Sequence, residues 1–390
     1  MHRVVTLFFL ACLTSFTLAQ ASTPNPNTPS SPLQIVYVID GSTLTTYDIN
    51  AETLQATEIG TTNLEESVDP RLTTSLNGHV VYYTAYQNIN QQGERLYVYD
   101  TDSSGVLNTQ PVQSISVNGI YSLQVDPNGR FLYMIQEGTG SNGFVPYAIV
   151  RAVIDPATGK ISQPVAEAKY KLESSTVFCS PSIFGMNASG TKLYDEIFCT
   201  YPHGGAEATY NERSVDPQTG TLGRDQKIYY WNNSSGGGEV VQFVKNLMFD
   251  FVIPNNYQQD INEVNVYPLE PNVTTPLIQC TASMLANCGS DNFGLAHPSA
   301  QYVFLFNPQQ TTDIDQVDLS SKQFLATSST IPYRVEQLSP DGSIAYAAND
   351  LNNGLNIQIY GFNVANAQVT SGGSISVPSD LDSWFAVERR

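Results

Sequence analysis

A few side chains in this sequence could carry acid–base chemistry or hold a polar ligand. His203 is followed by two glycines and lies four residues before Glu207, so a loop imidazole could act as a general base with a carboxylate to orient it. Arg334 and Glu336 lie two residues apart, and a guanidinium beside a carboxylate can hold an anionic or polyol ligand. The alternatives are an ordinary surface histidine and an arginine–glutamate pair that joins two neighbouring structural units.

Two acidic pairs, Asp100/Asp102 and Asp313/Asp315, have a spacing that calcium ligands often show. The same residue types also occur at turns, where side-chain oxygens accept hydrogen bonds from their own backbone. No glycine-flanked serine and no His-x-x-His pair accompanies His203, and the Gly-rich run 234–238 lacks the Lys-Ser/Thr of a phosphate loop. We therefore expect no metal site and no cofactor, with calcium as the weaker alternative.

The elements that must position these side chains are strands in a repeat. One pattern is a strand, a tight turn and a second strand, and many of its turns contain Asn-Gly, Ser-Gly or Asp-Gly. Such dipeptides supply the positive φ that two-residue hairpins need. The copies cover 72–83, 123–134, 184–195, 294–305 and 336–347, and a degenerate copy covers 240–252.

A second pattern is a strand that ends in an acidic residue or asparagine, a polar turn and another strand. Its seven copies are marked by residues 48, 100, 155, 216, 270, 318 and 363, which lie 45 to 61 residues apart. Two hairpins per period predict four antiparallel strands per unit, and such units stack radially as blades. We expect an all-β, seven-bladed β-propeller in which 383–388 completes the first blade as its innermost strand. The stretch 199–239 is interpreted as an insertion in the fourth blade.

Innermost strands line the central channel of a propeller, and binding sites gather at its mouth. Counting back from the turns of the first pattern places several polar side chains near that mouth. The predicted ligand-binding residues are Arg71, Tyr121 and Asn292, and the predicted catalytic candidates are Arg334, Glu336 and His203.

The beginning of the chain has the features of a targeting segment. Residues 1–21 contain Arg3, an apolar run and an Ala-Gln-Ala cleavage pattern, which predict a secretory signal peptide. Residues 22–33 contain Pro, Ser, Thr and Asn in abundance, as a solvated linker does. A single propeller domain is expected over 34–390, in a protein that is secreted or periplasmic.

Four cysteines remain after the predicted signal peptide, and an even number in an exported chain suggests two disulfides. Three pairings are possible. Cys179–Cys199 and Cys280–Cys288 are favoured because the members of each pair are close in sequence. The competing interpretation is a zinc site, although the spacings match no common zinc pattern.

The charge balance excludes some partners. The chain has 17 Lys and Arg against 36 Asp and Glu, a formal net charge of −19. A nucleic-acid-binding protein needs a basic surface, and an anionic membrane would repel this protein. We expect a monomer without a membrane span, whose partner is a small molecule, a glycan or a protein.

The repeats resemble a known family. The segments LQVDPNGRFLYMIQEG (123–138), RAVIDPATGKIS (151–162) and EQLSPDGSIAYAAND (336–350) are similar to those of the lactonase-type seven-bladed propellers, which include 6-phosphogluconolactonase, the carboxymuconate-cyclising enzyme and YVTN-repeat proteins. His297-Pro298-Ser299 keeps the form of the family's turns. The resemblance implies lactone hydrolysis or a muconate-type cycloisomerisation.

The few histidines and the acidic charge favour a different role, an exported ligand-binding or protein-interaction module. A lactone hydrolase or cycloisomerase is the alternative. A glycan-binding propeller is a third hypothesis, suggested by the many tyrosines and by the Asn- and Gln-rich loops.

Overall fold

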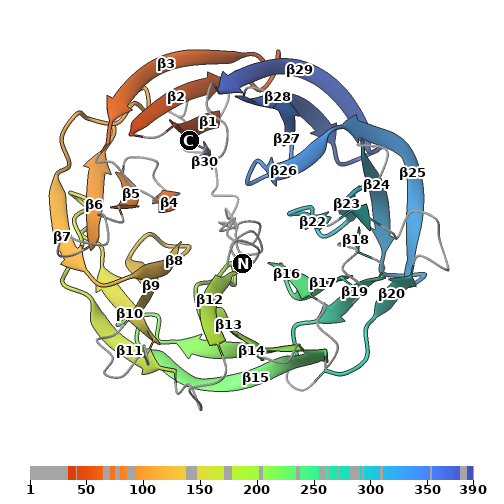
Figure 1. Cartoon of the computed structure of the whole chain (residues 1–390), viewed down its shortest axis with the longest axis horizontal. Coiled ribbons are helices and arrows are strands. Elements are labelled where there is room, and N and C mark those ends of the chain that lie inside the picture. Colours follow the sequence, from red (N-terminus) through yellow and green to blue (C-terminus); the bar gives the residue numbers. More distant parts are fainter. Residues whose placement is uncertain are drawn as a thin grey trace, which may run out of the picture.

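The computed structural model shows an all-β chain folded as a propeller (Figure 1). The structure describes residues 34–40, 42–64, 71–74, 80–85, 94–137, 147–170, 178–201, 205–233, 238–253, 260–261, 263–270, 273–281, 290–291, 294–307, 311–351, 354–377 and 384–389. The predicted signal peptide and linker, residues 1–33, lie outside these ranges.

The described strands form seven four-stranded antiparallel sheets and one two-stranded sheet. Sheet 1 contains β1 (Gln34–Asp40), β2 (Thr43–Ile49), β3 (Ala56–Asn63) and β30 (Trp384–Arg389). Sheet 2 contains β4 (Arg71–Thr74), β5 (Val80–Ala85), β6 (Glu94–Asp100) and β7 (Gln113–Val117). Sheet 3 contains β8 (Ile120–Val125), β9 (Phe131–Glu137), β10 (Tyr147–Val153) and β11 (Val165–Lys169). Sheet 4 contains β12 (Phe178–Met186), β13 (Lys192–Thr200), β14 (Ala206–Val215) and β15 (Leu222–Asn233).

The second half of the chain continues the same arrangement. Sheet 5 contains β16 (Gly238–Val244), β17 (Leu247–Ile253), β19 (Glu263–Pro268) and β20 (Ile278–Thr281). Sheet 6 contains β22 (Gly294–Ala296), β23 (Tyr302–Phe306), β24 (Thr311–Asp318) and β25 (Gln323–Pro332). Sheet 7 contains β26 (Arg334–Leu338), β27 (Ile344–Leu351), β28 (Gly354–Asn363) and β29 (Gln368–Val377). The two-stranded sheet pairs β18 (Asp260–Ile261) with β21 (Ser290–Asp291).

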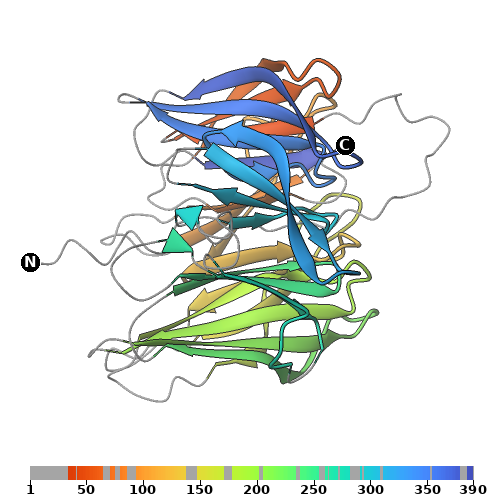
Figure 2. The ribbon, with the colours of Figure 1, turned by 90° about the vertical axis from the view of Figure 1, so that its right-hand side faces the viewer.

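The four-stranded sheets stand around a central axis, with β30, β4, β8, β12, β16, β22 and β26 nearest to it (Figure 1). Four antiparallel strands return the chain to the side of the ring on which it started, and short connections, such as 118–119 between β7 and β8, then lead into the next inner strand. The inner strands therefore run in the same direction along the axis. Their first residues therefore share one side of the ring, which we call the entry face, and the hairpins that follow them share the other, the turn face. Figure 2 shows the ring from the side, with the entry face on the left and the small β18–β21 sheet on it.

The two ends of the described chain meet in sheet 1. β30 pairs antiparallel with β1, from Gln34 opposite Arg389 to Ile39 opposite Trp384. The prediction that the C-terminal stretch becomes the innermost strand of the first sheet is confirmed, and the pairing leaves no open edge at the seam.

The turns follow the predicted residue types but not the predicted length. Gly129, Gly190 and Gly342 have positive φ, as expected. The connection after β8 is longer than two residues, because Gly129 N–H donates to the Asp126 carbonyl and closes a β-turn before β9 begins. The expectation of two-residue hairpins is therefore wrong there.

The acids of the second pattern serve their own turns, as predicted for Asx-type turns. Their side-chain oxygens accept hydrogen bonds from backbone N–H groups two residues further on. These acceptors and donors are Asp155 with Ala157, Asp216 with Gln218, Asp318 with Ser320 and Asn363 with Ala365, all at 2.8 to 2.9 Å.

The core consists of apolar layers between neighbouring sheets. Val36 and Val38 of sheet 1 pack with Ile344 and Tyr346 of sheet 7, for example. Tyrosines near the turn face add a recurring link, in which a phenol donates to a backbone carbonyl in the outer turn of the next sheet. These pairs are Tyr37 with Gly105, Tyr133 with Gly220 and Tyr302 with Val364, at 2.7 to 2.9 Å.

Residues 199–239 do not form an insertion. β14 and β15 lie in this stretch and are the two outer strands of sheet 4. The polar residues of β14 are accommodated by a buried network: Asp195 of β13 accepts from Arg213 Nε at 2.8 Å and from Tyr170 OH at 2.6 Å. That interpretation is therefore wrong.

Candidate functional site

Two of the predicted binding residues meet at the entry face. Arg71 is the first residue of β4, and its Nη1 donates to the backbone carbonyl of Tyr121 at 2.6 Å. Tyr121 lies in β8, so this bond joins the inner strands of sheets 2 and 3. The guanidinium is partly buried.

β-Bulges interrupt inner strands at two of the predicted positions. The register shifts between Ile120 and Ser122 around Tyr121, and between Val335 and Gln337 around Glu336. A bulge places one residue outside the alternation of its strand and re-aims its side chain. Tyr121 still packs against the apolar layer between sheets 3 and 4, whereas the side chain of Glu336 is 21% exposed.

Sequence reasoning missed the surroundings of Tyr121. Its ring packs edge-on against Tyr147 of β10, with the ring centroids 5.1 Å apart, and the two phenols share a hydrogen bond. Burial, followed by the nearby phenol of Tyr147, raises the pKa of Tyr121 well above its usual value. Burial also raises the pKa of Glu137, at the end of β9. Tyr147 and Glu137 belong to strands that the repeat pattern did not connect with the mouth.

Arg334 and Glu336 form the predicted ion pair. Both guanidinium contacts, through Nε and Nη2, reach Glu336 Oε1. The side chains are 44% and 21% exposed. Burial raises the pKa of the Glu336 carboxyl, and the charge of Arg334 opposes that rise. Since both residues belong to β26, this ion pair does not tie two sheets together, as the alternative interpretation held.

The remaining predicted candidates, His203 and Asn292, lie outside the described residues. Glu207, the predicted partner of His203, is described: its Oε2 accepts from Tyr230 OH at 2.8 Å, and it also shares a hydrogen bond with Tyr201.

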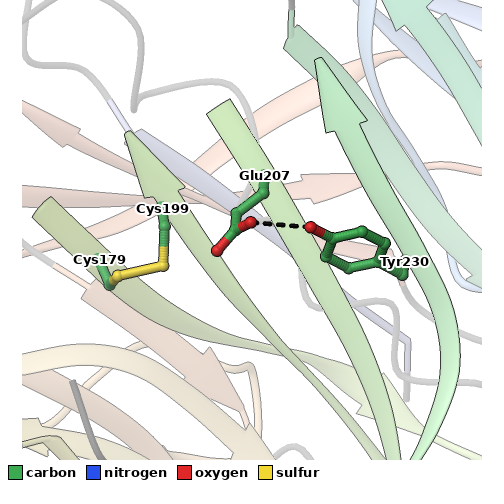
Figure 3. Close-up of a disulfide and its surroundings, with 4 residues drawn as sticks. All are labelled: Cys179, Cys199, Glu207 and Tyr230. Atoms are coloured by element: carbon green, nitrogen blue, oxygen red, sulfur yellow. Dashed lines mark hydrogen bonds between the residues drawn. A yellow bond between two sulfur atoms is a disulfide. The ribbon is translucent and has the colours of Figure 1, made fainter. Parts of the chain in front are cut away.

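The Cys179–Cys199 disulfide is confirmed. The two residues lie directly opposite each other in β12 and β13, with their Cα atoms 4.0 Å apart (Figure 3). Cys280 is also disulfide-bonded. Its predicted partner, Cys288, lies outside the described residues.

The predicted calcium pairs have other contacts. Asp102 Oδ1 accepts from the backbone N–H groups of Ser104 and Val106, at 2.8 and 3.1 Å. Asp313 accepts from Asn307 Nδ2 at 2.9 Å, whereas Asp315 points into the core between sheets 5 and 6 and is 1% exposed. No cluster of three or more His, Cys, Asp or Glu side chains within the described ranges is arranged to hold a metal ion.

His297 joins two sheets. It is fully buried, and its two ring nitrogens contact the Ser299 hydroxyl at 2.8 Å and the Gly342 carbonyl of sheet 7 at 3.0 Å. Burial lowers the pKa of His297 to about 4. A neutral, enclosed imidazole of this kind supports the packing of sheets 6 and 7.

Comparisons with known proteins agree on the fold. No protein-family model and no curated protein matches the chain. Among solved structures, it is similar to the periplasmic gluconolactonase PpgL of Pseudomonas aeruginosa, with 12% identity, a TM-score of 0.58 and coverage of 92% of this chain and 99% of that one. It is also similar to a puromycin hydrolase, with 9% identity, a TM-score of 0.56 and coverage of 94% and 57%. At such identities the likeness establishes a β-propeller.

Among the described residues, no helix has the length and apolar character to cross a bilayer.

Proposed function

We propose that this chain is an exported β-propeller that binds a small, oxygen-rich ligand at the entry-face mouth of its channel. In this proposal each four-stranded sheet is one blade, which makes the ring seven-bladed like the lactonase-type propellers. The Cys179–Cys199 disulfide supports an oxidising compartment, because such bonds rarely persist in the cytosol. We expect the cleaved signal peptide and the monomeric state to accompany this role.

The observation that carries the proposal is the chemistry gathered around the inner strands. Arg71, Tyr121, Tyr147 and Glu137 come from two adjacent sheets and meet at one side of the ring. The ion pair of Arg334 and Glu336 begins another inner strand on the same face. Guanidinium and phenol groups donate to carboxylate and hydroxyl oxygens, and carboxylates accept from hydroxyls, so an aldonate or a polyol fits this set.

Lactone hydrolysis is the second candidate, and the structural similarity to a gluconolactonase favours it. In such a reaction Glu336 would accept a proton from the attacking water, for which its raised pKa makes it a better base. Arg334 would stabilise the negative charge that develops on the carbonyl oxygen as the water adds, and this charge passes to the ring oxygen when the carbonyl re-forms and the ring C–O bond breaks. The alkoxide leaving group would recover the proton from the carboxyl.

One experiment separates these functions. Purified protein is tested for binding of gluconate, glucono-δ-lactone and neutral polyols by saturation-transfer NMR, and for lactone turnover above the uncatalysed rate. The variants are Arg71→Ala and Arg334→Ala, with Leu319→Ala, an exposed residue of the turn between β24 and β25, as the control. Binding without turnover that both arginine variants weaken supports the binding module. Turnover that only the arginine variants lose supports the hydrolase, and neither binding nor turnover by the wild-type protein refutes both.

A further inference from the structure

Sheet 4 is longer than the sheet before it. β13, β14 and β15 have 9, 10 and 12 residues, whereas β9, β10 and β11 of sheet 3 have 7, 7 and 5. The two sheets are aligned at the turn face, where Tyr133 of sheet 3 donates to the carbonyl of Gly220 in sheet 4. The additional length of sheet 4 therefore extends toward the entry face, beyond the described strands of sheet 3.

The side of sheet 4 that faces sheet 3 carries a group of exposed aromatic residues at this extension. Tyr229 faces the other way, since its ring packs on Tyr267 of sheet 5. Side chains alternate along a strand, so Tyr230 points to the sheet 3 side. Glu207 lies opposite Cys199 in the register of β13 and β14, and Figure 3 shows it directed toward Tyr230.

One carboxylate holds two tyrosines in this group. Glu207 Oε2 accepts from Tyr230 OH at 2.8 Å, and its hydrogen bond with Tyr201 raises the pKa of that phenol to about 12. The rings stay accessible, with Tyr201 38% and Tyr230 45% exposed. The ammonium of Lys227 lies 5.0 Å from the ring centroid of Tyr230, a cation–π contact that restrains this ring further.

The backbone beneath the group is also restrained. The Cys179–Cys199 disulfide crosslinks β12 to β13, and Cys199 is the direct neighbour of Glu207 across β13 and β14. Aromatic side chains already held in place lose little conformational entropy when a ligand covers them. Tyr201, Glu207, Tyr230 and Lys227 thus form a preorganised platform, which we call the tyrosine platform.

We propose that the tyrosine platform binds a neutral polysaccharide. Pyranose rings present C–H faces that pack on aromatic rings, and their hydroxyls can donate to the Glu207 carboxylate or accept from Lys227. The net charge of −19 disfavours anionic polymers, because long-range repulsion would oppose their approach. Glu207, Lys227 and Tyr230 lie on β14 and β15, the outer strands of sheet 4, whereas Arg71, Tyr121 and Arg334 lie on inner strands, so this site is distinct from the channel mouth.

The test is retention of the full chain on insoluble chitin, cellulose and curdlan, three neutral polysaccharides. The wild-type protein should be retained by at least one of them. The double variant Tyr201→Ala/Tyr230→Ala should lose about tenfold or more in affinity, because it removes both rings. Tyr230→Phe keeps the ring and should retain most of the binding. Leu319→Ala should bind as the wild-type protein does.

Circular dichroism and the melting temperature show whether the double variant remains folded. If it does not, retention of the single variant Tyr230→Ala on the same polysaccharides replaces it in the test. The proposal is overturned if the wild-type protein is retained by none of the three polymers, or if the folded alanine variants bind as well as the wild type. Retention on heparin in place of the neutral polymers would also overturn it. Loss of binding in Arg334→Ala, with binding intact in the tyrosine variants, would assign the polysaccharide to the channel mouth instead.

Discussion

Replacing Asp315 by asparagine should stabilise this protein at neutral pH and not at acidic pH. Asp315 is 1% exposed and lies on β24 opposite Val303, within the apolar layer between sheets 5 and 6. Its Oδ1 accepts no hydrogen bond from any described residue. A buried carboxylate with so little compensation is unfavourable, and its protonated form is preferred.

The size of the effect follows from the pKa. Burial, followed by the charge of Asp313, raises the pKa of Asp315 from 3.8 to about 6. The native state therefore holds this proton more tightly than the unfolded chain does. The associated stabilisation is complete below the unfolded-state pKa and is lost as the pH rises through the folded-state pKa. A difference of about two pKa units corresponds to about 3 kcal/mol of unfolding free energy at most.

The assay is urea unfolding of wild-type protein and Asp315→Asn at about pH 4.5 and about pH 7.5. The variant should be more stable than the wild type at the higher pH, by up to about 3 kcal/mol, and close to it at the lower pH. Asp318→Asn is the control with the opposite sign. Hydrogen bonds from Ser320 and Ser321 lower the pKa of Asp318, so its contribution is complete above the unfolded-state pKa of about 3.9. Asp318→Asn should therefore be less stable than the wild type by a similar amount at both pH values. An Asp315→Asn variant whose stability relative to wild type does not change with pH would refute the reasoning.

Three further variants and one truncation test other parts of the fold. The stability of Glu196→Gln relative to the wild type should increase as the pH rises from 4.5 to about 7, since burial raises the pKa of Glu196 to about 7; a difference between the two urea midpoints that stays constant over this range would contradict it. Cys179→Ser with Cys199→Ser should lose about 3 kcal/mol, because the crosslink closes a loop with a separation of 20 residues; chemical unfolding with and without a reductant measures it. Gly342→Ala should lower the melting temperature strongly, because φ is +75° and a Cβ would lie 2.1 Å from His297 Nε2; a melting curve like that of the wild type would show that the link between sheets 6 and 7 is dispensable. A chain that lacks β30 should aggregate or melt far below the full chain, as size-exclusion chromatography would show, because β1 would become an open inner edge.

The repeat could be predicted because its signals are local. The acids at 155, 216 and 318 serve turns within three residues of themselves, so their meaning does not depend on distant parts of the chain. The pairing of β30 with β1 was also predictable, since the first repeat lacked an inner strand and the C-terminal stretch was in excess.

The site was less predictable because its partners are distant in sequence. Tyr121 meets Arg71 only after sheets 2 and 3 have packed together, and it meets Tyr147 within sheet 3, where β8 and β10 are separated by β9. The bulges that re-aim Tyr121 and Glu336 add a residue to one strand, and no hydrophobic alternation in the sequence announces them.

The stretch 199–239 produced the clearest error, although the copy of the second pattern at 216 already indicated a hairpin within it. β14 contains Asn211, Glu212 and Arg213, which are 3%, 9% and 6% exposed, so part of this strand lacks the apolar alternation typical of the repeat. The strand is stable because Asp195, on the neighbouring strand, meets Arg213 in a buried ion pair. The carboxylate that pairs with Arg213 belongs to β13 and lies before residue 199, so the ion pair could not be recognised from the stretch 199–239 alone.

The seam of sheet 1 determines how the ring would respond to mechanical tension. Gln34 and Arg389, near the two ends of the described chain, face each other across β1 and β30. A force that separates these ends would load the hydrogen bonds of this pair first and then those of the next pair, as in unzipping, and would never load all of them together in shear. The ring would open at this seam at low force, whereas attachment through one end alone would leave the β1–β30 ladder unloaded.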